Sequence, residues 1–131
     1  MDPFAASDAT ILLVVSGPVM RAALRDALEN AGYLVVTAGD LAEAIDRLKE
    51  MAYDLLIIRP YIDSMPGRIA ADNLRGRRPG LPVLMVSGLI DDDRVMNEYA
   101  VEDFHIFPKP FSRDELLTQV REVLRVVRNK R

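Results

Sequence analysis

The sequence has no cysteine and only one histidine, His105. The lack of cysteine excludes disulfides, thiolate catalysis and cysteine-ligated metal sites, and a single histidine excludes a multi-histidine metal site. The longest continuous apolar run, residues 11–15, is far too short to cross a bilayer, and no secretory leader is visible. We therefore predict no membrane association and, by default, a cytoplasmic location.

The chain also lacks an excess of basic residues. Lysine and arginine number 17 against 20 acidic residues, which gives a net charge of −3. Direct nucleic-acid binding usually needs a concentrated basic face, so we predict none. No glycine-rich phosphate loop or nucleophile-histidine arrangement is evident, and no enzymatic activity is predicted. The 131 residues fit one compact domain, and a hydrophobic content of 50% is enough for a core.

Short apolar runs alternate with amphipathic stretches along the chain. Strands are predicted at residues 11–15, 33–37, 55–58, 83–86 and 104–107, because continuous apolar runs of this length are typical of strands covered on both faces. Helices are predicted at residues 18–31, 41–51, 68–75, 91–99 and from 113 onward, with a loop at 60–67. This alternation predicts an α/β domain with a parallel sheet and helices on both faces.

Recognisable residues mark the ends of several helices. Asp40 is predicted to cap the second helix, and Gly32 to end the first. Ser112 and Glu115 form a capping-box pattern at the last helix. We expect residues 1–9 to be a loose leader, 10–127 to form the domain, and 128–131 to be a basic tail or linker.

Several segments match one family pattern. The most specific is Phe-Pro-Lys-Pro-Phe at residues 107–111, which leads directly into the last helix. Residues 82–88 match a fourth strand with the small hydroxyl residue that ends it, and Pro18, Arg21 and Gly67 match further landmarks. Over residues 10–127 the chain therefore resembles bacterial response-regulator receiver domains. The resemblance implies a doubly wound, flavodoxin-like sheet of five strands in the order 2-1-3-4-5.

The acidic residues that receiver domains use are missing from the matching positions. In the family, an acidic pair after the first strand helps to hold magnesium, and an acid ending the third strand accepts a phosphoryl group from a histidine kinase. Registered on Pro18 and Arg21, the sequence has Val15 and Ser16 at the acidic pair and Arg59 at the acceptor. Valine offers no ligand oxygen and arginine repels the cation, so we predict no magnesium cofactor and no conventional phosphorylation.

Two polar residues of the receiver pattern remain. Ser87 matches the hydroxyl residue, and Lys109 the lysine, that contact the phosphoryl oxygens in family members, whereas the switch aromatic is replaced by Ile106. The predicted degenerate pocket consists of Val15, Ser16, Arg59, Ser87 and Lys109. Because Arg59 and Lys109 side by side would repel, we expect one to turn outward, a carboxylate to join them, or the pair and Ser87 to form a small anion site.

Other ionisable residues have simpler interpretations. Asp63 is the one acid in the segment 60–67, and a solvated loop carboxylate is favoured over a substitute acceptor. Asp63 and Asp92 are also candidate carboxylates to pair with Arg59 or Lys109. The three aspartates at residues 91–93 are more typical of a helix start than of a metal site. His105 is more typical of a surface or packing residue than of a phosphorylation site.

Two functions from different classes stay open. The first is a phosphorylation-independent signalling module of a bacterial two-component system, forming part of a larger regulator or hybrid kinase. Its partner would be a histidine kinase, another regulator, an adjoining domain or a second copy of the chain. The candidate contact face comprises Arg94, Asn97, Glu98, Tyr99, Ile106 and Arg113. The second function is an anion or small-ligand sensor that uses Arg59, Ser87 and Lys109, and phosphotransfer through a non-standard acid is disfavoured.

Overall fold

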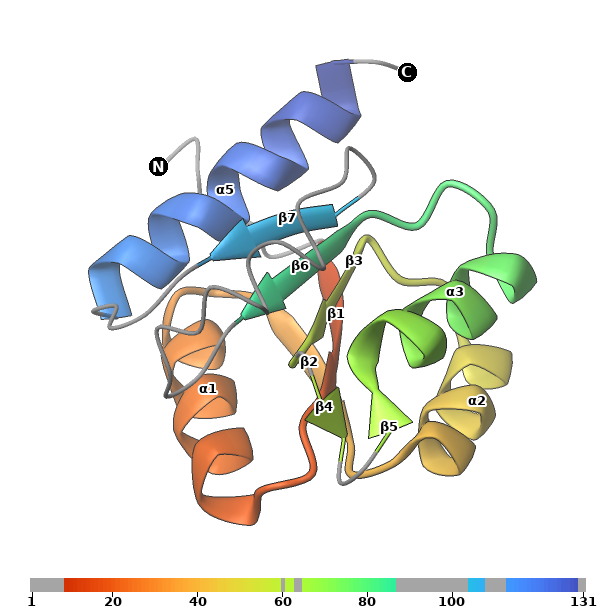
Figure 1. Cartoon of the computed structure of the whole chain (residues 1–131). Coiled ribbons are helices and arrows are strands. Elements are labelled where there is room, and N and C mark those ends of the chain that lie inside the picture. The colour runs from red at the N-terminus through yellow and green to blue at the C-terminus, as the bar shows by residue number, and fades with distance from the viewer. Residues whose placement is uncertain (1–8, 60, 63–64, 87–103, 108–112, 130–131) are drawn as a thin grey trace.

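The computed structural model describes residues 9–59, 61–62, 65–86, 104–107 and 113–129, with only the backbone of 104–107 and 126–129 (Figure 1). The elements, in chain order, are β1 (Thr10–Val14), α1 (Pro18–Asn30), β2 (Leu34–Ala38), α2 (Leu41–Glu50), β3 (Leu55–Ile58), β4 (Tyr61–Ile62), β5 (Met65–Pro66), α3 (Gly67–Arg77), β6 (Val83–Val86), β7 (Phe104–Phe107) and α5 (Arg113–Asn129).

Five of the strands form one parallel sheet in the order β2-β1-β3-β6-β7. In sequence order these are the strands 2-1-3-4-5, so the predicted fold class and strand order are confirmed. The two central strands, β1 and β3, are buried along their whole length. Ile11 of β1 pairs with Val35 of β2 on one side and with Leu55 of β3 on the other.

Helices cover both faces of this sheet and divide the apolar core in two. Figure 1 shows α1 and α5 on one side and α2 and α3 on the other. Alternate residues of β1 serve the two sides: Ile11 and Leu13 pack with α1 and α5, whereas Leu12 and Val14 pack with α2 and α3. This two-sided burial explains why the strands read as continuous apolar runs.

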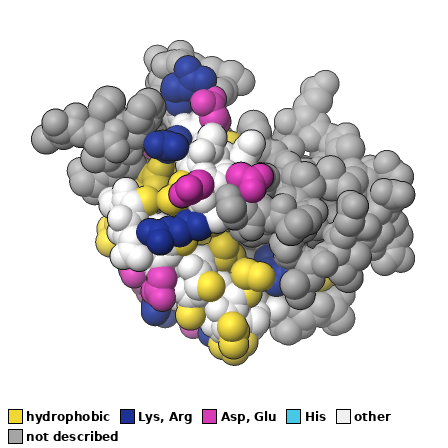
Figure 2. All heavy atoms as spheres, turned by 90° about the vertical axis from the view of Figure 1, so that its left-hand side faces the viewer, with side chains coloured by type: hydrophobic (Ala, Val, Ile, Leu, Met, Phe, Trp, Pro, Cys, Tyr) yellow, Lys and Arg dark blue, Asp and Glu magenta, His cyan; other side chains and the backbone are white. Residues whose placement is uncertain are grey.

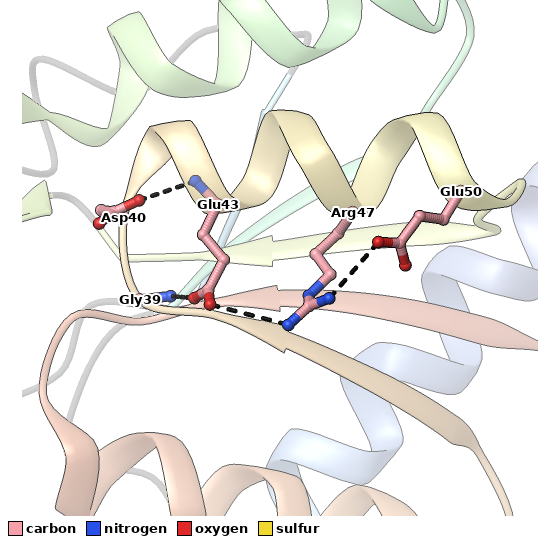
Figure 3. Close-up of polar contacts among 5 residues, drawn as sticks. All are labelled: Gly39, Asp40, Glu43, Arg47 and Glu50. Atoms are coloured by element: carbon pink, nitrogen blue, oxygen red, sulfur yellow. Dashed lines mark hydrogen bonds and ion pairs between the residues drawn. The ribbon is translucent and has the colours of Figure 1, made fainter.

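The ends of α1 and α2 follow from their capping residues. Pro18 opens α1, where its missing N–H removes no intrahelical bond, and Gly32 follows the helix with a φ of 101°. At α2, Asp40 Oδ1 accepts from the Glu43 N–H at 2.8 Å, which confirms Asp40 as the N-cap. Glu43 Oε1 in turn accepts from the Gly39 N–H at 2.6 Å (Figure 3).

The other end of the Figure 3 network lies on the exposed side of α2. Arg47 lies 3.7 Å from Glu43 and 3.5 Å from Glu50, measured between the nearest nitrogen and oxygen atoms. Exposed pairs of this kind stabilise a helix by only a few tenths of a kcal/mol each. The reciprocal hydrogen bonds at the start of the helix therefore matter more for its position.

The predicted loop at residues 60–67 was wrong in part. Tyr61–Ile62 and Met65–Pro66 pair as a short antiparallel hairpin, and Gly67 already belongs to α3. Ile62 is 3% exposed and packs with the core beside α2 and α3. Burial of this side chain holds Tyr61–Ile62 against the domain, and pairing with Met65–Pro66 supplies partners for part of the backbone of these two strands.

Two helices are longer than predicted. α3 ends at Arg77 instead of residue 75, and its buried side includes Ala70, Ala71 and Leu74. α5 continues to Asn129, so part of the expected basic tail is helical. The predicted helix at 91–99 and the cap Ser112 lie outside the described residues.

Candidate functional site

Two of the predicted pocket residues meet at the carboxyl ends of the central strands. The sheet register pairs Val14 of β1 with Ile58 of β3. Val15 and Arg59, the next residue after each strand, therefore lie at neighbouring strand ends. Ligand sites of doubly wound sheets lie outside this edge.

Val15 belongs to the apolar core. Its side chain is fully buried with residues of α1 and α5, and its N–H donates to the Ala38 carbonyl at 3.0 Å. The Val15 carbonyl accepts from Nη1 of Arg21 at 2.8 Å, and the Ser16 carbonyl lies 3.5 Å from the same nitrogen. These contacts fix the backbone at this end of β1, while Ser16 stays half-buried.

Arg21 is a residue whose role the sequence did not reveal, although it served as a landmark. It comes from the first turn of α1, and its guanidinium lies above Gly39. A Cβ atom added to Gly39 would lie only 3.0 Å from Arg21 Nη1. Arg21 thus links the start of α1, the end of β1 and the segment that leads into α2. An arginine one turn into a helix that follows a strand after a short loop is the available sequence signal.

Arg59 is half-buried at the end of β3. Burial lowers the pKa of its guanidinium below the ordinary value, because partial removal from water disfavours the charged form. Within the described part of the chain, no hydrogen bond or ion pair joins Arg59 to another residue. Its positive charge is therefore uncompensated by the residues that the structure describes, and it favours an oxyanion over a metal cation.

Most of the remaining predicted site residues lie outside the described part of the chain. Ser87, Lys109, Asp63 and Asp92 lie outside the described residues, as do Arg94, Asn97, Glu98 and Tyr99 of the predicted contact face. Ile106 lies in β7, where its backbone pairs with Met85; the structure describes only the backbone of this residue. Arg113 is exposed as the first residue of α5.

Among the described residues, no group of three acidic, histidine or cysteine side chains is placed to hold a metal ion. None of the helices seen there is long and apolar enough to cross a membrane. The absence of a magnesium cofactor stays a prediction.

An exposed apolar group was missed by the sequence reasoning. Val19 is 84% exposed at the start of α1, beside exposed Ala22 and Ala23. Figure 2 views the molecule from the side on which α1 lies and shows apolar side chains gathered at the lower end, with charged side chains above them. Val19 is off the buried stripe of Leu24 and Leu28, which is the signal that predicts its exposure.

The doubly wound sheet and its 2-1-3-4-5 strand order define the class of the fold. Residues 11–121 match the response regulator receiver domain family, and the chain belongs to this family. Receiver domains act in two-component systems, where they interact with kinases or other regulators.

Individual relatives agree with this assignment. The chain is 32% identical over 117 residues to the probable transcriptional regulatory protein TcrX of Mycobacterium tuberculosis. This alignment covers 88% of this chain and 50% of TcrX. It is 32% identical over 118 residues to the sensor kinase CckA of Brucella abortus, in an alignment that covers 88% of this chain and 12% of CckA. The chain therefore spans half or less of the length of these two relatives.

Solved structures of the same family have the same fold. Chemotaxis protein CheY4 of Vibrio cholerae superposes with a TM-score of 0.76 at 26% identity, covering 88% of this chain and 98% of that one. A response regulator receiver protein from Sinorhizobium medicae gives a TM-score of 0.77 at 28% identity, covering 91% and 96%.

Proposed function

We propose that this receiver domain signals through protein contacts without being phosphorylated. The observation that carries the proposal is a half-buried arginine, Arg59, directly after β3 and beside Val15 at the end of β1. A carboxylate can form an acyl phosphate, and a guanidinium cannot take that role. The proposed role is a binding role, with no enzymatic activity and with no magnesium cofactor.

Electrostatics also disfavours a magnesium ion at this edge. A divalent cation roughly 6 Å from a guanidinium is repelled by about 5 kcal/mol at an effective dielectric constant of about 20. Hard cations need anionic oxygen ligands to offset such a cost. Val15 contributes no side-chain oxygen, and its carbonyl already accepts from Arg21.

The proposed partner is a kinase, another regulator, an adjoining domain or a second copy of the chain, and the proposed location is cytoplasmic. TcrX and CckA both extend beyond the region that matches this chain, which supports a receiver that works beside further domains.

Beryllofluoride with magnesium tests the proposal, because it mimics an acyl phosphate on an intact acceptor. In an amide NMR titration we expect no magnesium-dependent shifts near residue 59 and no rise in melting temperature. A receiver domain that holds all three acids serves as the positive control. A magnesium-dependent response near residue 59 or 63 would contradict the proposal and point to a substitute acceptor.

A second function is favoured by one specific observation. Arg59 is half-buried, and the described residues supply no counter-charge. Arginine suits bidentate recognition of oxyanions, so the former acceptor pocket would serve as an anion or small-ligand sensor with Ser87 and Lys109.

Arg59→Met distinguishes a sensor from a passive charge. Removing a half-buried and uncompensated charge is expected to raise the free energy of unfolding by roughly 0.5–1 kcal/mol in buffer without polyvalent anions. If the pocket binds anions, sulfate should stabilise the wild type more than Arg59→Met, beyond the general stabilisation by sulfate that both proteins share. Urea denaturation with and without sulfate measures both effects. A loss of stability in the variant would instead show that Arg59 makes a net stabilising contact, such as an ion pair with a carboxylate.

A further inference from the structure

A polar cavity lies between the carboxyl ends of α2 and α3. It has a volume of about 190 Å³ and is lined by Ile45, Leu48, Lys49, Arg77 and Arg78. Figure 1 shows α2 and α3 side by side, both running against the direction of the strands. The helices therefore end at the amino edge of the sheet, opposite the edge that holds Arg59.

Three of the five residues that line this cavity are cationic. Arg78 Nη2 donates to the Leu48 carbonyl at 2.7 Å, and Arg77 Nε donates to Asn73 Oδ1 at 3.1 Å. Both acceptors are neutral, so the hydrogen bonds orient the two guanidinium groups without cancelling their charge. Among the described residues, no carboxylate forms an ion pair with Lys49, Arg77 or Arg78.

Cations at helix ends often serve only to balance the helix dipoles. Each carboxyl end carries roughly half an elementary negative charge, so two ends offset about one of the three positive charges. In the last turn of α2, the Arg47 carbonyl accepts from the Tyr53 hydroxyl at 3.0 Å and the Leu48 carbonyl accepts from Arg78, so these two carbonyls do not engage Lys49 or Arg77. Burial first, and then the charge of Glu50, raises the pKa of Tyr53, so this hydroxyl stays a donor. A positive surplus remains at the cavity.

We propose that this cavity, the α2–α3 basic site, binds a small ligand that carries a diphosphate group. Arginine forks match phosphate oxygens bidentately, and Lys49 adds a third charge. Ile45 and Leu48 provide an apolar wall for an uncharged part of the ligand. A cavity of about 190 Å³ admits a compact group, and the net charge of −3 disfavours an extended polyanion. The proposal does not depend on the state of the acceptor pocket.

Titration with inorganic pyrophosphate, followed by amide NMR, tests the site. We expect saturable shifts at Lys49, Arg77 and Arg78, and affinity at least tenfold weaker in Lys49→Gln/Arg77→Gln. Lys49 and Arg77 are exposed, so the double variant should keep the apolar core and the hydrogen bond from Arg78 to the Leu48 carbonyl. The matched control is Arg25→Gln/Arg125→Gln, which removes the same charge from α1 and α5 and should bind like the wild type.

Three results would overturn the proposal. The first is the absence of saturable shifts at the site in the wild type. The second is equal weakening in the control variant, because that would show general attraction to surface charge. The third is a response confined to the surroundings of Arg59, which would assign the anion to the former acceptor pocket.

Discussion

Leu56→Ala is expected to lower the free energy of unfolding by about 3 kcal/mol. Leu56 is fully buried in the central strand β3, where it pairs with Leu12 on one side and Val83 on the other. Neighbouring strands on both sides prevent collapse into the vacated space, so the loss combines the transfer of the side chain with a residual cavity. Urea denaturation followed by circular dichroism measures the change.

Leu34→Ala is the control for this loss. The same leucine-to-alanine substitution is made here on the edge strand β2, where Leu34 is 52% exposed. We expect a loss below about 1 kcal/mol, because little apolar area is removed from water there. Equal losses in the two variants would contradict the burial of Leu56 at the centre of the domain.

Asp54→Ala is the second substitution with a large expected effect, about 2 kcal/mol. Asp54 Oδ2 accepts from the Thr10 N–H at 2.7 Å, and the Asp54 N–H donates to the Thr10 carbonyl at 2.8 Å. These two hydrogen bonds join the starts of β1 and β3. Thr10 is only 9% exposed, so its N–H would lose a charged acceptor without full access to water.

Asp54→Asn separates the hydrogen bond from the charge. The amide oxygen can accept from Thr10 in the same geometry, and a neutral acceptor forms a weaker bond than a carboxylate. We expect the asparagine variant to lose roughly half as much stability as the alanine variant, measured by the same denaturation. A full loss in the asparagine variant would show that charge, rather than the acceptor oxygen, joins the two strands.

The fold could be predicted because strong local signals agree with the tertiary structure. The strands at residues 55–58, 83–86 and 104–107 have the predicted bounds, since continuous apolar runs suit strands buried on both faces. Pro18 and Asp40 mark helix starts whose chemistry depends only on nearby residues. Parallel pairing then follows from the helices between the strands.

Very short elements and contacts between distant residues could not be predicted. The β4–β5 hairpin has strands of two residues, too short for a period of two to be visible. The bond from Arg78 to the Leu48 carbonyl depends on how two helices pack, and Thr10 meets Asp54 across 44 positions. These contacts have no local signature.

The candidate site shows the same division. Counting along the predicted strands places Val15 and Arg59 next to each other, and the register agrees. The burial of the Val15 side chain and the contact between Arg21 and the Val15 carbonyl needed the packed helices. The convergence of Ser87 and Lys109 with Arg59 stays a prediction.

The sheet acts as a partition between two separate groups of apolar side chains. Leu28 belongs to the group under α1 and α5, and Leu74 to the group under α2 and α3. Substitutions in separate groups share no contacting partner, so their effects on stability should add rather than compensate one another. Each helical layer is consequently free to diverge during evolution without a matching change in the other. A domain built this way can acquire a new binding surface on one side while the opposite side preserves the fold.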